Sequence, residues 1–176
     1  MIISGCPGTG KTSVAARMAE QSPRGVHIVS DLFYRFIAHR LLPILPESHD
    51  QNATVISAVA RSVGAFAAGG YDMLVDGVIG PWFIPLVARE LEPVGVAVDY
   101  VVLRAPLEVT LARAGNRQDP GAEQIVRHMH DQFAQLGTLE RHAIETEGQS
   151  PDETVAEIRR RQRMGALRLE LARHAG

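Results

Sequence analysis

A glycine-rich segment of the sequence carries one lysine and one threonine at the spacing of a phosphate-binding site. Residues 5–12 read Gly-Cys-Pro-Gly-Thr-Gly-Lys-Thr and match the pattern G-x-x-x-x-G-K-[ST] without a gap. Glycines allow successive backbone N–H groups to point at an anion. We therefore expect Lys11 to reach the β- and γ-phosphates of ATP, and the Thr12 hydroxyl to ligate magnesium. The residues expected to contact the nucleotide are Gly5, Pro7, Gly8, Thr9, Gly10, Lys11, Thr12 and Ser13.

The residues around this loop provide the context that such a motif requires. The apolar residues 1–4 predict a short strand before the loop, and the helix-forming residues 13–20 predict a helix after it. The amino end of that helix would add its positive dipole to the anion site. A chance glycine-rich turn is the alternative, and the strand and helix on either side argue against it.

Two aspartates follow apolar runs that are typical of strands. Asp31 comes after residues 26–30, and Asp76 ends residues 73–76. In open α/β sheets the carboxyl ends of the strands face the ligand. Asp31 could accept the proton of an attacking hydroxyl or hold a magnesium-bound water, and capping of the next helix is the structural alternative. Asp76 is expected to bind magnesium or the acceptor, or to be a structural strand-end acid.

Gly77 follows Asp76 at the position where many motor and ring-forming ATPases carry a glutamate that activates water. The absence of that acid favours transfer to a bound acceptor over hydrolysis. The irregular stretch 43–52 is predicted to cover the acceptor as a flap, with a plain surface loop as the alternative. Trp82 could form an apolar wall of the acceptor site or belong to the core. The side chains expected to contact the acceptor are Asp31, Tyr34, Gln51, Asn52, Asp76, Gly77, Trp82 and Phe83.

Arg113 and Arg117 lie four residues apart in a segment that begins as a helix. At this spacing two side chains share one helix face. Arginines on a closing lid, which we expect over about residues 113–136, would stabilise charge on the transferred phosphoryl group, and Arg113 would also contact the nucleotide. Two solvated surface arginines are the alternative. His128 and His130 would face different sides of a helix, so we expect no zinc site.

The composition limits the class of protein. A chain of 176 residues with 45% hydrophobic residues fits one globular domain with its own core. A formal charge of −2 lacks the basic excess of nucleic-acid-binding proteins, and polar residues interrupt the apolar stretches, so neither nucleic acid nor a membrane is an expected partner. Without a leader-like segment or cysteine pairs, the chain is expected to be cytoplasmic, as a monomer or homodimer. Cys6 is interpreted as a small loop residue rather than a redox-sensitive thiol.

Short apolar runs alternate with helical patterns along the chain, which predicts an α/β fold with a parallel sheet. The runs 73–75 and 100–103 are apolar at every position, as strands covered on both faces must be. The arginine- and leucine-rich tail 159–173 is predicted to form an exposed amphipathic helix. The predicted strands are residues 2–4, 26–30, 73–76, 98–103 and 143–145.

The order of these features resembles a known family. A phosphate loop, an acid after the second strand, aspartate-glycine after the third and a late pair of arginines are similar to the small P-loop kinases, which include chloramphenicol phosphotransferase, shikimate kinase and gluconate kinase. The resemblance covers nearly the whole chain and implies a three-layer P-loop NTPase fold with a parallel sheet in the order 2-3-1-4-5 and a helical lid. It also implies that Asp31 is the general base, that Arg113 and Arg117 act on the lid, and that adenine lies near residues 146–150.

These features predict an ATP- and magnesium-dependent phosphotransferase that acts on a hydroxyl group of a small molecule. The aromatic pair Trp82-Phe83 fits an antibiotic or other secondary metabolite as acceptor. A kinase of central metabolites or nucleotides is the first alternative. The second belongs to another class: a nucleotide-binding protein that sequesters a ligand without phosphorylating it. A GTP-binding switch is disfavoured, because Asn116-Arg117-Gln118-Asp119 follows a predicted helix instead of an apolar strand.

Overall fold

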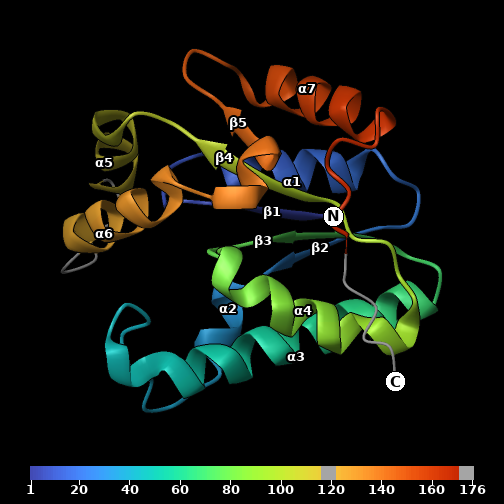
Figure 1. The fold of residues 1–176 in the computed structure, drawn as a ribbon, viewed down its shortest axis with the longest axis horizontal. Helices are drawn as coiled ribbons and strands as arrows, with labels where there is room; N and C mark the ends of the chain where they lie inside the picture. The colour runs from blue at the N-terminus through green and yellow to red at the C-terminus, as the bar shows by residue number, and fades with distance from the viewer. Residues whose placement is uncertain (116–121, 171–176) are drawn as a thin grey trace.

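A sheet of five parallel strands forms the centre of the molecule (Figure 1). The computed structural model describes residues 1–115 and 122–170 of the 176-residue chain. The strands lie in the order β2-β3-β1-β4-β5, as predicted, so the first strand is central. The strands are β1 (Ile2–Gly5), β2 (Gly25–Val29), β3 (Asp72–Asp76), β4 (Tyr100–Arg104) and β5 (Ala143–Glu145).

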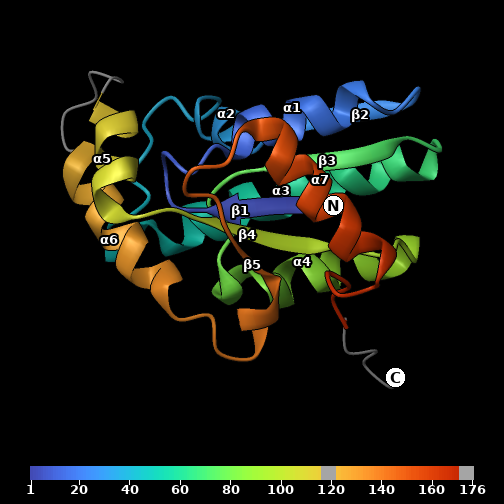
Figure 2. The same cartoon turned by 90° about the horizontal axis from the view of Figure 1, so that it is seen from above.

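Helices cover both faces of the sheet and one of its ends. In Figure 1, α1 and α7 lie on one face and α3 and α4 on the other, which gives three layers. Figure 2 shows α5 and α6 together beyond the end of the sheet to which β1 points. The α-helices are α1 (Lys11–Glu20), α2 (Asp31–Tyr34), α3 (His49–Ala68), α4 (Ile84–Leu91), α5 (Leu107–Gly115), α6 (Ala122–Ala134) and α7 (Pro151–Arg163). Short 3₁₀ helices are η1 (Pro46–Ser48), η2 (Pro81–Phe83), η3 (Glu92–Val94) and η4 (Gly137–His142). Among the helices of the described residues, none has the length and apolar character needed to cross a membrane.

The central strands are apolar on both faces because helices bury both. In β4, Tyr100, Val101, Val102 and Leu103 are each fully buried. Alternate residues enter different cores: Val101 and Leu103 pack with α1 and α7, whereas Tyr100 and Val102 pack with α3 and α4. Because all five strands are parallel, their carboxyl ends lie at one edge of the sheet, where α5 and α6 lie.

The predicted helix over residues 159–173 is wrong in its second half. α7 ends at Arg163, and the chain then runs beside the start of β4, where the backbone N–H of Tyr100 donates to the carbonyl oxygen of Leu167. Leu167 and Leu169 are buried in the core. These leucines are two residues apart, as in an extended segment, and their burial outweighs the helix-forming arginines around them. The last three residues of the predicted range lie outside the described part of the chain.

The segment 43–52 is irregular only in part. α3 begins at His49, so Gln51 and Asn52 lie in its first turn rather than in a flap. The side-chain amide of Gln51 accepts from the backbone N–H of Leu41 at 2.7 Å and donates to its carbonyl oxygen at 3.0 Å. This pair of hydrogen bonds ties the loop before α3 to the helix, so that the loop has a defined position beside the carboxyl edge of the sheet.

Candidate functional site

The predicted phosphate loop connects the end of β1 to the start of α1, and its backbone lies directly against α5. A Cβ atom at Gly8, where φ is 90°, would lie 2.6 Å from the carbonyl oxygen of Thr110, so only glycine fits this approach. Arg113 of α5 donates from Nη1 to the carbonyl oxygen of Gly8 at 3.3 Å. One of the two predicted arginines therefore contacts the loop. Arg117 lies outside the described residues.

Lys11 is the first residue of α1, and its ammonium group folds back over the loop. Nζ of Lys11 donates to the carbonyl oxygen of Cys6 at 3.0 Å, and Oγ1 of Thr9 donates to the same oxygen at 2.9 Å. The Lys11 side chain is buried, whereas Thr12 is exposed on the first turn of the helix. The contact with Cys6 holds the positive charge of Lys11 within the loop. The hydroxyl of Thr12 is accessible beside it.

Lys11 is the only lysine in the sequence, which uses arginine for all its other cationic side chains apart from histidine. Sequence reasoning missed this signal, although the composition contains it. An ammonium group is compact, whereas a guanidinium group is broad and planar, so the two are not interchangeable in a closed loop. The single lysine thus stands where its compact ammonium group is buried over the Cys6 carbonyl oxygen.

Cys6, within the same loop, is a buried thiol. Its Sγ donates to the carbonyl oxygen of Val126 in α6 at 3.3 Å. Burial raises the pKa of the thiol from 9.0 to about 11, against the opposing effect of the Lys11 ammonium. The thiolate is the reactive form, so it is scarce at neutral pH. Cys6 therefore behaves as a small structural residue of the loop.

We expect Cys6 to resist alkylation in the folded protein. At pH 8, iodoacetamide should label the folded chain at least about 100-fold more slowly than the urea-unfolded chain, because burial both shields the sulfur and raises its pKa. Between pH 8 and 10 the rate in the folded protein should keep rising, whereas the unfolded rate should level off above the ordinary thiol pKa. Mass spectrometry of the labelled chain measures both rates, and fast labelling of the folded protein at pH 8 would contradict the expectation.

Asp76 ends β3 as a buried carboxylate that is only 2% exposed. Nε2 of His27, on the neighbouring strand β2, lies 2.7 Å from Oδ2 of Asp76 and donates to it. The parallel register pairs Val29 with Asp76, which brings the His27 side chain to the same face of the sheet. Sequence reasoning missed His27, whose one signal is a polar side chain between the apolar residues Val26 and Ile28.

Removal of this hydrogen bond should destabilise the protein. His27→Ala is expected to lower the free energy of unfolding by about 1–3 kcal/mol, because the buried carboxylate of Asp76 would lose a hydrogen-bond partner. Urea unfolding followed by circular dichroism measures the change. His39→Ala, at an exposed position, is the matched control and should change the free energy of unfolding by less than about 0.5 kcal/mol. Equal effects of the two substitutions would refute the importance of the His27 contact.

Asp31 is exposed at the start of α2, and the turn that carries it lies against the end of β3. The backbone N–H of Ser30 donates to the carbonyl oxygen of Asp76 at 2.9 Å, and a Cβ atom at Gly77 would lie 1.7 Å from Oγ of Ser30. Gly77 thus allows the ends of β2 and β3 to approach each other. Burial and the charge of Asp31 raise the pKa of Tyr34 to about 12, so its phenol stays protonated as a hydrogen-bond donor.

A cavity of about 960 Å³ opens beside Asp31 at the carboxyl edge of the sheet. Its walls come from α2 and the following loop on one side and from α6 on the other, elements that face each other in Figure 1. Pro7 of the phosphate loop also lines it, so the cavity extends to the loop. Five of the predicted acceptor contacts line this cavity: Asp31, Tyr34, Asn52, Trp82 and Phe83.

The other predicted acceptor contacts lie outside the cavity lining: Gln51 binds the backbone of Leu41, while Asp76 and Gly77 lie at the strand ends. Sequence reasoning missed the contribution of α6 and of two arginines after α2. A spacing of three and four residues on α6 indicates one common face, but no local pattern shows what that face covers. The missed residues are Arg35, Arg40, Ile125, His128, Met129 and Gln132.

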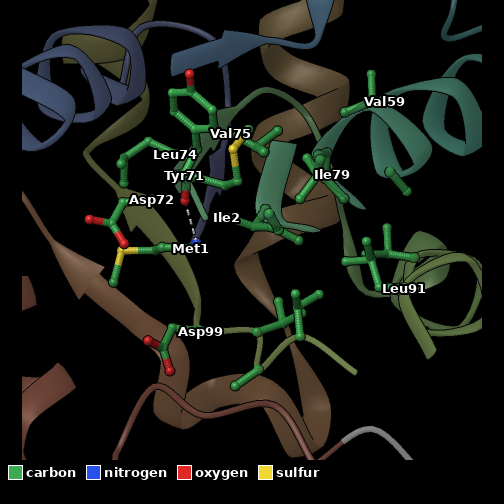
Figure 3. A pocket seen from close by; sticks show the side chains of 18 of the residues that line it. Met1, Ile2, Val59, Tyr71, Asp72, Leu74, Val75, Ile79, Leu91 and Asp99 are labelled. Carbon is green, nitrogen blue, oxygen red and sulfur yellow. Dashed lines mark hydrogen bonds between the residues drawn. The ribbon is translucent and has the colours of Figure 1, made fainter. Parts of the chain in front are cut away.

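A second cavity, of about 390 Å³, lies at the opposite, amino edge of the sheet. Figure 3 shows Asp72 and Asp99 on one side of this cavity and Val59, Ile79 and Leu91 on the other. No residue of the phosphate loop lines it. Ligands of open α/β sheets bind at the carboxyl ends of the strands, so the larger cavity beside Asp31 is the candidate functional site.

Comparison with protein families identifies the group to which this fold belongs. A family model described as an AAA domain matches residues 1–142, which include the phosphate loop and both strand-end aspartates. The chain belongs to this family. The match covers the sheet up to the start of β5, together with α5 and α6. No curated protein sequence matches the chain.

Solved structures share the fold of this AAA-domain protein. A sugar kinase from a Janibacter species has a TM-score of 0.69 at 18% identity, over 98% of this chain and 97% of that chain. The tunicamycin resistance protein of Deinococcus radiodurans has a TM-score of 0.65 at 18% identity, over 94% of each chain. Shikimate kinase from Acinetobacter baumannii, solved in complex with shikimate, has a TM-score of 0.57 at 21% identity, over 93% of this chain and 92% of that chain. The predicted resemblance to the small P-loop kinases is confirmed for the fold.

Proposed function

We propose that this protein transfers the γ-phosphate of ATP to a hydroxyl group of a small molecule. The observation that carries the proposal is that Asp31 and Pro7 of the phosphate loop line one cavity, in which an acceptor could lie next to the triphosphate. The fold supports it, because solved structures with the same fold include a sugar kinase and a shikimate kinase. Walls from α2 and α6 on opposite sides of the cavity favour a small molecule as the acceptor.

In the proposed reaction Asp31 accepts the proton of the acceptor hydroxyl as its oxygen bonds to the γ-phosphorus. The bond between that phosphorus and the β–γ bridging oxygen breaks, and its electron pair leaves with ADP. Lys11 and the N–H groups of the loop hold the phosphates throughout. Arg113, which contacts the carbonyl oxygen of Gly8, adds positive charge beside the transferred group.

Thr12 and Asp76 are the residues that would hold a magnesium ion. Their hydroxyl and carboxylate oxygens are hard donors, which magnesium prefers over nitrogen or sulfur ligands. His27 engages Oδ2 of Asp76 and thereby fixes the direction of the carboxylate. When bound, magnesium would neutralise charge on the β- and γ-phosphates.

Asp31→Asn should abolish phosphate transfer while leaving ATP binding intact. We expect kcat to fall at least about 100-fold, because an amide cannot accept the hydroxyl proton. Acceptor-dependent ADP release measures kcat, and isothermal titration measures ATP affinity. Asp131→Asn, an exposed acid of α6 outside the cavity lining, is the control and should be fully active. Unchanged turnover in Asp31→Asn would remove the proposed base, and ligand binding without any turnover in the unsubstituted protein would favour sequestration.

Lys11→Arg should weaken ATP binding at least about ten-fold, which corresponds to about 1.4 kcal/mol. The reason is that a guanidinium group is too broad to occupy the buried position over the Cys6 carbonyl oxygen. Isothermal titration with ATP in the presence of magnesium measures the effect. Arg17→Lys, on the exposed face of α1, makes the reverse exchange and should bind ATP as the unsubstituted protein does. ATP affinity that survives Lys11→Arg would place the triphosphate elsewhere.

A further inference from the structure

The cavity beside Asp31 is larger and more apolar than a small polyol needs. Its volume of about 960 Å³ lies near the upper end of the range of roughly 300–1,000 Å³ that is usual for ligand pockets. A compact hydrophilic acceptor would leave most of the apolar wall in contact with water, which is unfavourable. The apolar wall is formed by Leu41, Leu42, Pro43, Ile44, Ile56, Val78, Trp82, Phe83, Ile125 and Met129.

Several exposed hydrophobic side chains lie in the segments that contribute to this cavity. Ten large hydrophobic side chains are exposed among residues 1–115 and 122–170; five of them lie from Leu32 to Leu45, and a sixth is Trp82. Leu41, Leu42 and Trp82 belong both to this exposed set and to the cavity lining. Single exposed hydrophobic residues are common, but a group of them around a cavity marks a binding surface for apolar groups. The wall formed by Leu41, Leu42 and Trp82 is therefore suited to an apolar part of the ligand.

One side chain of the lining, that of Asn52, has a buried oxygen without a hydrogen-bond partner in the described structure. Oδ1 of Asn52 is the one buried side-chain nitrogen or oxygen in the described part of the chain that forms no hydrogen bond. The orientation of this amide is fixed, because Nδ2 donates to the carbonyl oxygen of Pro43 at 2.7 Å and to Oγ of Ser48 at 3.0 Å. Oδ1 can therefore only accept. A ligand that donates an N–H or O–H group would satisfy it.

The charges of the lining restrict the ligand further. Arg35 and Arg40 both line the cavity, and within the described residues neither forms an ion pair. These two guanidinium groups outnumber Asp31, the one carboxylate among the described residues of the lining, so the cavity disfavours a polycationic acceptor such as an oligoamine. They are compatible with neutral and anionic molecules.

We propose that the acceptor is an amphipathic alcohol with three parts: a hydroxyl group next to Asp31, a second donor group for Oδ1 of Asn52, and a bulky acyl, alkyl or aryl body against Leu41, Leu42 and Trp82. This acceptor class rests on the proposed function only for the transfer step, because binding to the cavity can be measured without ATP. A protein segment is a poorer occupant, since Asp31 lies within a cavity that is walled on opposite sides by α2 and α6.

Trp82 makes binding measurable, because it is the only tryptophan in the chain and lines the cavity. Three probes separate the parts of the proposed acceptor: glycerol, 2-octyloxyethanol and 1-O-octylglycerol, with the two octyl ethers used below the concentration at which they aggregate. 1-O-Octylglycerol should change the Trp82 fluorescence and bind at least about ten-fold more tightly than glycerol, which lacks the apolar body. It should also bind at least about three-fold more tightly than 2-octyloxyethanol, which lacks the second hydroxyl. Equal affinities, or no binding of 1-O-octylglycerol, would overturn the proposal.

Two substitutions test the residues that carry the argument. Leu42→Ser should weaken binding of 1-O-octylglycerol about five-fold or more, whereas Leu45→Ser, exposed but outside the lining, should leave it unchanged. Asn52→Leu should remove the preference for 1-O-octylglycerol over 2-octyloxyethanol. Circular dichroism verifies that each variant is folded. If Asn52→Leu does not fold, the affinities of the unsubstituted protein for 1-O-octylglycerol and 2-octyloxyethanol decide whether the second hydroxyl contributes to binding.

Release of ADP in the presence of ATP and magnesium tests the transfer step separately. Tight binding of 1-O-octylglycerol without ADP release would overturn the proposed phosphotransfer and leave the ligand class standing. Equal stimulation of ADP release by glycerol and 1-O-octylglycerol, with no difference in affinity, would overturn the ligand class and leave phosphotransfer standing.

Discussion

Direct backbone contact between the phosphate loop and α5 is the constraint on which the rest of the site depends. Gly8 lies against the carbonyl oxygen of Thr110 at a separation that no side chain would allow. In the loop held in this way, the carbonyl oxygen of Cys6 accepts a hydrogen bond from the ammonium of Lys11. A second close approach, at Gly77, sets the turn that carries Asp31. The cation is thus held by a main-chain oxygen, and the turn that carries the acid is held by the Ser30–Asp76 backbone hydrogen bond and by the room that Gly77 leaves for the Ser30 side chain.

The fold could be predicted from the sequence because each signal is local. A gapless glycine-rich motif, apolar runs without alternation and helical spacings between them are sufficient for a doubly covered parallel sheet, and the family resemblance supplied its strand order. The helix prediction for residues 159–173 was wrong because a contact with a distant part of the chain decides the structure of this segment. Its arginines favour a helix, yet Leu167 and Leu169 are buried beside the start of β4, about 70 residues earlier in the chain. Helix propensities describe single residues and cannot predict a contact between two distant segments.

In the candidate site, too, features set by local sequence could be predicted, and features set by distant contacts could not. The loop residues, Asp31 and the aromatic pair were found because their types and positions after strands are informative by themselves, and their catalytic roles stay predictions. The partner of Asp76 could not be found, since His27 is 49 residues away in sequence and meets it only through the register of β2 and β3. The contribution of α6 to the cavity is likewise set by how that helix lies across the carboxyl edge. A periodic pattern identifies a buried face but not the surface it covers.

The restriction of lysine to one position has a consequence for covalent modification. Acetylation of a lysine side chain removes its positive charge, and in this chain that reaction has a single target, Lys11 of the phosphate loop. The outer surface carries its positive charge on guanidinium groups, such as Arg61 paired with Glu90, and these do not react in the same way. An acetyl group on a lysine of this protein therefore acts on the loop itself and leaves the charge of the outer surface unchanged.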